Sequence, residues 1–344
     1  MLTVKERKNY TSCGDKAAEN LLDKVLAEMR DALAGTGLSV YLGGSYGRGD
    51  GGVRQDKENG ILYNDLDFFV FAGKKPADAE ILLKEISEKY EKMLQVDVDF
   101  SSIMSVKDIK KNCKRLMMQE LKRGYHLVCG EDLLAEYLPE FPAEKLPFSE
   151  ACRLLLNRGM GLWLAGEKIA GRSDEKDFIL RNIYKAILGA GDAMLISSGE
   201  YRWSIVERLE CIEKSDIPQE WKAYYREAVA FKNSPHRQMK KDMQPFWNGV
   251  RDFFQSAMVR CAGESRHNEL TDGIYSKCCR SGEVSLKNYI KYCIKSRSLP
   301  LIWHHWYTMP AAAVLLSDLY FILNDMPEEI DRKSKLYRQW LIFN

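Results

Sequence analysis

The sequence has almost no excess charge, few histidines and no closely paired metal-binding cysteines. Its 51 lysine and arginine residues face 49 aspartate and glutamate residues, which leaves a formal charge of +2. A chain built to coat a polyanion would carry a large basic excess, so any contact with nucleic acid must come from a local patch. No CxxC pair occurs among the nine cysteines, and the five histidines do not join them at zinc-ligand spacing. This pattern argues against a structural zinc site.

Long apolar runs are also missing. The first residues, MLTVKERKNYTSCGDK, lack the apolar core of a signal peptide, and no run of about 18 apolar residues predicts a membrane span. The cysteines are odd in number and scattered, which is typical of reduced thiols. We therefore expect a cytoplasmic protein with no membrane partner. At 344 residues, 45% of them hydrophobic, the chain is long enough for two globular domains.

Helix and strand patterns alternate in the first part of the chain. Apolar residues at helical spacing and short β-prone runs predict a helix, two strands, a helix, a strand and a helix, at 16–34, 38–42, 65–71, 77–94, 95–100 and 105–122. The connection from Asp50 to Asn64 is polar and contains several glycines, so we expect a loop there.

Helical periodicity dominates from about residue 148 onward. The predicted helices lie at 149–165, 178–197, 220–231, 242–262, 285–296 and 309–323. The stretch 137–147, rich in proline and glutamate, is the natural boundary between the two parts. The sequence thus predicts an α+β chain with an N-terminal domain at 1–140 and an all-α helical bundle at 148–344.

Two aspartates spaced by one residue carry the strongest chemical signal. Alternate residues of a strand point to one side, so Asp65 and Asp67 would share a face and could bind divalent cations. Two such ions about 3.5–4 Å apart can stabilise the attacking and leaving oxygens of a nucleotidyl transfer. On the next predicted strand, Asp97 or Asp99 could complete the metal shell and accept the proton of an acceptor hydroxyl. The choice stays open, with Asp99 favoured because two serines follow it.

A glycine-serine turn precedes these acids. Gly43 and Gly44 have no side chains, so backbone N–H groups could approach a triphosphate there, and Ser45 adds a hydroxyl donor. Arg48 could add a charge-assisted hydrogen bond to a phosphate oxygen. The alternative for Arg48 is an ordinary surface ion pair with Asp50.

The stretches GGSYGRG at 43–49 and NDLDFFV at 64–70 resemble the DNA polymerase β-type nucleotidyltransferase superfamily. Within it, the chain is most similar to the aminoglycoside and lincosamide nucleotidyltransferases and to the minimal nucleotidyltransferases. The resemblance covers about residues 38–130 and implies the nucleotidyltransferase fold, with a mixed sheet and flanking helices. It assigns the triphosphate contact to Gly44 and Ser45 and the two Mg²⁺ ions to Asp65 and Asp67. The third carboxylate is Asp97 or Asp99.

The resemblance implies transfer of a nucleoside monophosphate, with ATP as the expected donor, to a hydroxyl group. A small-molecule acceptor such as an antibiotic fits the near-neutral charge, while a tRNA or protein acceptor and a non-catalytic nucleotide-binding regulator stay open. Related two-domain enzymes place a basic helical residue against the nucleotide, which here points to Lys185; a solvated helix face shared with Asp192 is the alternative. A homodimer also stays open. The connection at 50–64 is longer than the family's usual loop and is interpreted as a lid or an insertion.

Overall fold

The computed structural model describes residues 9–56, 59–236, 242–263, 269–300, 304–324 and 330–343. Its contacts divide the chain into two compact units. The first consists of Met1–Pro142 and Ala230–His236, and the second of Ala143–Val229 and Arg237–Asn344. The division falls within the 137–147 stretch, but residues 230–236, which we expected in the helical domain, belong to the first unit.

Three contacts explain why residues 230–236 belong there. The Phe231 ring lies 5.8 Å from that of Tyr63, and the hydroxyl of Ser12 donates to the carbonyl of Asn233 at 3.3 Å. Pro235 approaches Gly52 so closely that a Cβ on that glycine would lie 3.2 Å from the proline ring. Helical periodicity in the sequence could not reveal these partners, because they lie more than 150 residues away along the chain.

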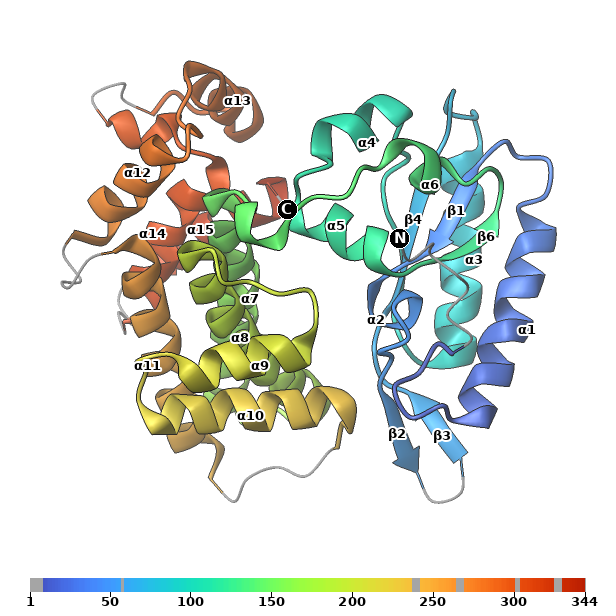
Figure 1. The fold of residues 1–344 in the computed structure, drawn as a ribbon, viewed down its shortest axis with the longest axis horizontal. Helices are drawn as coiled ribbons and strands as arrows, with labels where there is room; N and C mark the ends of the chain where they lie inside the picture. Colours follow the sequence, from blue (N-terminus) through green and yellow to red (C-terminus); the bar gives the residue numbers. More distant parts are fainter. Residues whose placement is uncertain are drawn as a thin grey trace. The chain divides into compact units, whose positions relative to one another are not determined.

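The first unit contains a four-stranded mixed sheet, a separate two-stranded hairpin and six helices among its described residues (Figure 1). In chain order these elements are α1 Lys16–Ala32, β1 Ser39–Leu42, α2 Gly44–Gly47, β2 Val53–Asp56, β3 Asn59–Leu62, β4 Leu66–Phe71, α3 Ala79–Leu94, β5 Val98–Phe100, α4 Val106–Asn112, α5 Leu116–Arg123, β6 His126–Cys129 and α6 Leu133–Tyr137. The strand order is β5-β4-β1-β6. β1 pairs antiparallel with β4 and β6, whereas β4 pairs parallel with β5.

The two faces of β4 pack in two separate cores. Leu66, Phe68 and Val70 lie in the core that α1 and α3 cover, whereas Phe69 and Phe71 pack with the side chains of α4, α5 and α6. This alternation follows from the two-residue period of a strand. Asp67 has the same parity as Phe69, so its side chain emerges on the α5 side.

The first unit also corrects several predicted boundaries. The strand predicted from Asp65 begins at Leu66, and the helix predicted at 105–122 is two helices, α4 and α5. The break between them is held by Gln119, whose buried side-chain amide donates to the carbonyl of Cys113 at 2.6 Å. The strands β2, β3 and β6 and the helices α2 and α6 were not predicted, because each is too short to show a clear period.

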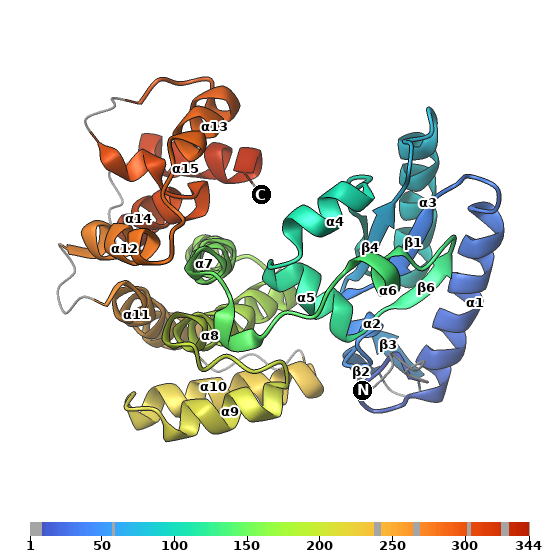
Figure 2. The ribbon, with the colours of Figure 1, turned by 45° about the horizontal axis from the view of Figure 1, so that its top comes forward.

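The second unit is all-α within its described residues (Figure 2). Its elements are η1 Ala143–Lys145, α7 Phe148–Ala170, α8 Lys176–Ser198, α9 Ile205–Lys214, α10 Gln219–Asn233, α11 Met243–Ala262, α12 Leu270–Arg280, α13 Leu286–Ser296, η3 His305–Thr308, α14 Ala311–Leu323 and α15 Ile330–Phe343. The last residues of α10 belong to the first unit. The six predicted helices of this region are present, and α9, α12 and α15 are additional. The α+β class is confirmed.

Two further expectations concern single features of the chain. All nine cysteines are free thiols, in agreement with the expected reduced state. No helix in the described ranges combines the length and the apolar character that crossing a membrane requires.

A buried ionic cluster joins α8, α9 and α10. The Arg208 guanidinium lies 3.0 Å from the Asp192 carboxylate, and the side chains are only 7% and 13% exposed. The Tyr225 hydroxyl donates to the same carboxylate at 2.6 Å. Burial, followed by the negative charge of Asp192, raises the pKa of Tyr225 well above its ordinary value. Asp192 is therefore part of the bundle's interior and not of a solvated helix face.

We expect Asp192→Ala to lower the free energy of unfolding by about 3 kcal/mol, because it leaves the Arg208 charge buried without its carboxylate. The measurement is urea denaturation. A matched control is Asp216→Ala, since the Arg260–Asp216 pair has a similar 2.9 Å distance but is 41% and 87% exposed. Exposed pairs of this kind contribute about 1 kcal/mol or less. Equal losses in the two variants would contradict the prediction.

Candidate functional site

The register of the sheet places Asp67 directly beside Asp99. In the parallel pair β4–β5, Leu66 is opposite Val98 and Asp67 is opposite Asp99. Paired residues of neighbouring strands point to the same side of a sheet, so these two carboxylates share one face. Asp67 is half-buried and Asp99 is exposed. Of the two predicted candidates on β5, the register thus puts Asp99 next to Asp67.

Asp65 and Asp97 each lie two residues earlier in the chain, immediately before β4 and β5. The backbone N–H of Leu66 donates to the carbonyl of Asp97 at 2.8 Å, which continues the ladder to that level. Asp65 is half-buried, and the Asp97 side chain is exposed. All four predicted acids therefore lie at, or just before, the starts of the adjacent strands β4 and β5.

The glycine-serine turn packs directly on the Asp67 carboxylate. The N–H of Gly43 donates to the carbonyl of Asp67 at 2.8 Å. Gly44 has a φ of +60°, and a Cβ built on it would lie 2.1 Å from Oδ2 of Asp67. Gly43 is confined in the same way, because its Cβ would lie 2.6 Å from the Phe69 ring. Ser45 is half-buried in the single turn of α2.

We expect Gly44→Ala to lower the free energy of unfolding by about 1–3 kcal/mol more than Gly37→Ala does, because the new methyl group overpacks against Asp67. Gly37 is a matched control: its φ is +73°, also left-handed, but nothing lies within 4 Å of its Cβ position. Both variants share the backbone strain, so chemical denaturation isolates the contact. Losses that agree within error would show that the carboxylate moves aside at no cost.

Tyr46 is a key residue of the turn that the sequence did not reveal. Its fully buried hydroxyl donates to the carbonyl of Gly52 at 2.9 Å and accepts the N–H groups of Tyr63 at 3.0 Å and Asn64 at 3.3 Å. Burial raises the pKa of Tyr46 far above its ordinary value. The Tyr46 hydroxyl thus forms hydrogen bonds with three backbone groups, and two of them belong to the residues immediately before Asp65. The only signal in the sequence is an aromatic residue between the glycines of GGSYGRG.

The connection at 50–64 contains the β2–β3 hairpin. Its register pairs Val53 with Leu62 and Arg54 with Ile61. At the base of the hairpin, the side-chain oxygen of Asn64 accepts the N–H of Gly52 at 2.7 Å. Residues 57 and 58, between the two strands, lie outside the described residues. The long loop is therefore an ordered hairpin at its base, and a role as a lid stays a prediction.

We expect Tyr46→Phe to speed amide hydrogen exchange at Asn64, because its half-buried N–H loses its acceptor, whereas the N–H of Tyr63 keeps the carbonyl of Gly52 at 3.1 Å. A matched control is Tyr41→Phe. The Tyr41 hydroxyl is also buried against backbone, donating to the carbonyl of Glu131 at 2.7 Å and accepting the N–H of Leu133 at 2.8 Å. In that variant exchange at Asn64 should stay as in the parent protein. Unaltered protection at Asn64 in Tyr46→Phe would refute this role.

Two predicted phosphate contacts have other partners or another location. The Arg48 guanidinium lies 3.3 Å from Glu120 and 3.6 Å from Asp50, with its side chain 19% exposed. The predicted pair with Asp50 is thus present, and Glu120 of α5 adds a second carboxylate. Lys185 lies on α8 in the second unit and is half-buried. Contact of either residue with a phosphate stays a prediction.

Binding of a cation depends on how many oxygen ligands the acids bring together. Within the described ranges, no group of three or more histidine, cysteine, aspartate or glutamate side chains is arranged to hold a metal ion. Asp67 and Asp99, paired by register, are the residues that could supply oxygen ligands. Mg²⁺ commonly takes one or two protein carboxylates and completes its shell with water and substrate phosphates.

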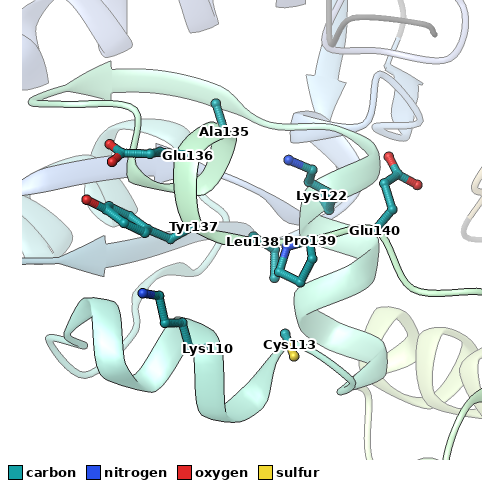
Figure 3. A pocket seen from close by; sticks show the side chains of 9 residues that line it. All are labelled: Lys110, Cys113, Lys122, Ala135, Glu136, Tyr137, Leu138, Pro139 and Glu140. Carbon is teal, nitrogen blue, oxygen red and sulfur yellow. The ribbon is translucent and has the colours of Figure 1, made fainter.

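A separate pocket of about 550 Å³ lies among α4, α5 and α6 (Figure 3). Its lining includes Lys110, Lys122 and Tyr137, with the Lys110 ammonium 5.0 Å from the centre of the Tyr137 ring. The Lys122 ammonium donates to the carbonyl of Leu134 at 3.2 Å. None of the predicted site residues lines this pocket, so it is distinct from the acids and the turn.

No protein-family model, curated protein or solved structure matches this chain. The likeness to nucleotidyltransferases therefore rests on the two short motifs at 43–49 and 64–70. The function has to be argued from the arrangement of the turn and the acids themselves.

Proposed function

We propose that this chain is a Mg²⁺-dependent nucleotidyltransferase. It transfers a nucleoside monophosphate, AMP in the expected case, from a nucleoside triphosphate to the hydroxyl group of a small-molecule acceptor and releases pyrophosphate. The observation that carries the proposal is the register of Asp67 opposite Asp99, with the backbone of Gly44 against the Asp67 carboxylate. The motif resemblance at 43–49 and 64–70 supports the same activity.

The donor chemistry fits Mg²⁺, a hard cation that prefers carboxylate oxygens. Asp67 and Asp99 would hold the first ion, and Asp65 would join Asp67 at the second. The metal would neutralise charge that develops on the phosphate oxygens during transfer. Because Gly44 has no side chain, the backbone of the turn lies close to the Asp67 carboxylate, beside which a metal-bound triphosphate would lie.

The chain's own residues then divide the remaining work. Ser45 and the backbone N–H groups of the turn orient the triphosphate through hydrogen bonds. Asp99, the exposed carboxylate of the pair, accepts the proton of the attacking hydroxyl. Its exposure leaves space for an acceptor beside it, whereas the half-buried Asp67 is held by the turn.

One observation favours a second candidate, a nucleotide-binding regulator without catalysis. The described acids do not form a group of three metal ligands. Such a protein would bind a nucleoside triphosphate on the turn and leave it intact. A tRNA or protein acceptor has no specific support among the described residues of the site.

We expect Asp67→Asn and Asp99→Asn each to reduce Mg²⁺-dependent release of pyrophosphate from ATP by about a hundredfold or more, because general-base and metal-ligand roles have contributions of this size. The assay follows labelled ATP with a panel of aminoglycoside and lincosamide acceptors. Asp97→Asn is a matched control immediately before the same strand and should retain most of the activity.

Nucleotide binding separates the two candidates. If the parent protein binds ATP with Mg²⁺ but releases no pyrophosphate with any acceptor, the regulator is correct. Activity that survives Asp67→Asn, or that falls equally in Asp97→Asn and Asp99→Asn, contradicts the roles given to these residues.

A further inference from the structure

Exposed large apolar side chains gather on α13 of the second unit. Leu286, Ile290 and Ile294 occur at every fourth residue of the helix, and they are 68%, 50% and 72% exposed. Leu299, just beyond the helix, is 86% exposed. Residues four apart lie above one another on a helix, so the three form one continuous ridge. Single exposed apolar residues are ordinary, but a ridge of them marks an interaction surface.

The end of α15 packs on the face of α13 opposite the ridge, and it has exposed apolar side chains of its own. α13 contacts α15 (Figure 2), and the ring of Tyr292 stacks on that of Phe343 with centroids 5.1 Å apart. The Lys295 ammonium lies 3.5 Å from the carbonyl of Ile342. Next to this contact, Leu341 and Ile342 are 57% and 43% exposed. Apolar side chains thus come from two helices and not from one alone.

A row of positive charge runs beside the ridge. Lys287, Lys291 and Lys295 also follow one another at every fourth residue, each one position after a ridge residue, and all three are exposed. Arg297 follows and is exposed too. From Val284 to Ser317 the chain contains no aspartate or glutamate. This stretch is therefore strongly basic although the whole chain carries a formal charge of only +2.

These features select among the kinds of partner. A second copy joined through the same surface would bring two lysine rows together, which costs energy. Single-stranded nucleic acid would use aromatic platforms, and the ridge is aliphatic. The opposite face of α13 is fixed by Tyr292, only 4% exposed, so the helix cannot be enclosed in a deep groove in the way that groove-bound helices are. A helix with a single exposed face can bind a flat surface.

We propose that the exposed face of α13 binds the surface of an anionic lipid bilayer. The aliphatic ridge inserts among the upper acyl chains while the longer lysine side chains reach the headgroups. No membrane-spanning helix is needed for this mode of binding. The inference goes beyond our sequence-based expectation of no membrane partner, which rested on the lack of a long apolar run. It is independent of the proposed nucleotidyl transfer.

The test is flotation of the full chain with vesicles of phosphatidylcholine alone or mixed with phosphatidylglycerol, at low and high salt. We expect binding to the mixed vesicles only, weakened by salt. The variant K287Q/K291Q/K295Q should bind about a hundredfold more weakly, from the contribution of each basic residue near an anionic surface. The variant I290S/I294S should also lose binding, because insertion requires the ridge.

A matched control is I81S/K92Q on α3 of the first unit, which changes an isoleucine that is 62% exposed and an exposed lysine. It should bind like the parent, and circular dichroism checks that all variants stay folded. Absence of binding to the mixed vesicles would overturn the proposal. So would equal binding to both vesicle types, or binding to poly(U) that I290S/I294S leaves intact, since that result would assign the lysine row to a nucleic acid.

Discussion

The position of β4 between an antiparallel and a parallel neighbour constrains the rest of the first unit. Because β1 runs antiparallel to β4, the chain leaves β1 beside the start of β4, where Gly43 meets Asp67. Because β5 runs parallel to β4, its own start lies at the same edge, where Asp99 is opposite Asp67. One edge of the sheet therefore holds the glycine-serine turn, the pair Asp65 and Asp67, and the pair Asp97 and Asp99, although they are spread over nearly 60 residues of sequence.

Around this edge, buried polar groups limit how the backbone can move. A buried backbone N–H or carbonyl needs a partner, and Tyr46 supplies one for three such groups with a single hydroxyl. Gly51 and Gly52 pass so close to Tyr46 and Asn64 that a Cβ on either would collide with them. The base of the β2–β3 hairpin and the segment leading to Asp65 are thus fixed together. The same network links the glycine-serine turn to the segment that carries Asp65.

The second unit illustrates how average composition can hide local character. A formal charge of +2 indicates no overall basic excess, yet the α13 stretch is basic and contains no acid. Inside the bundle the opposite occurs, since the one ionic cluster that joins α8 to α9 is almost fully buried. Charged side chains therefore stabilise the interior of the bundle in one place and form an exposed basic surface in another.

The sequence by itself determined the long elements. α1, α3, α7, α8 and α11 show their apolar stripes over many residues, so local periodicity identified each of them. The sequence also showed that the glycine turn precedes the acids, because each of the two motifs is continuous in the chain. The sequence did not reveal Tyr46, and it left the choice between Asp97 and Asp99 open, with Asp99 favoured.

Only the tertiary structure decided what depends on distant partners. Strand register put Asp99 and not Asp97 opposite Asp67, and Phe231 joined the first unit because its partner is Tyr63. The exposure of the α13 ridge is of the same kind, since an apolar stripe looks identical in sequence whether it is buried or open. A period describes which residues share a face, whereas burial and pairing are set by segments that meet only when the chain has folded.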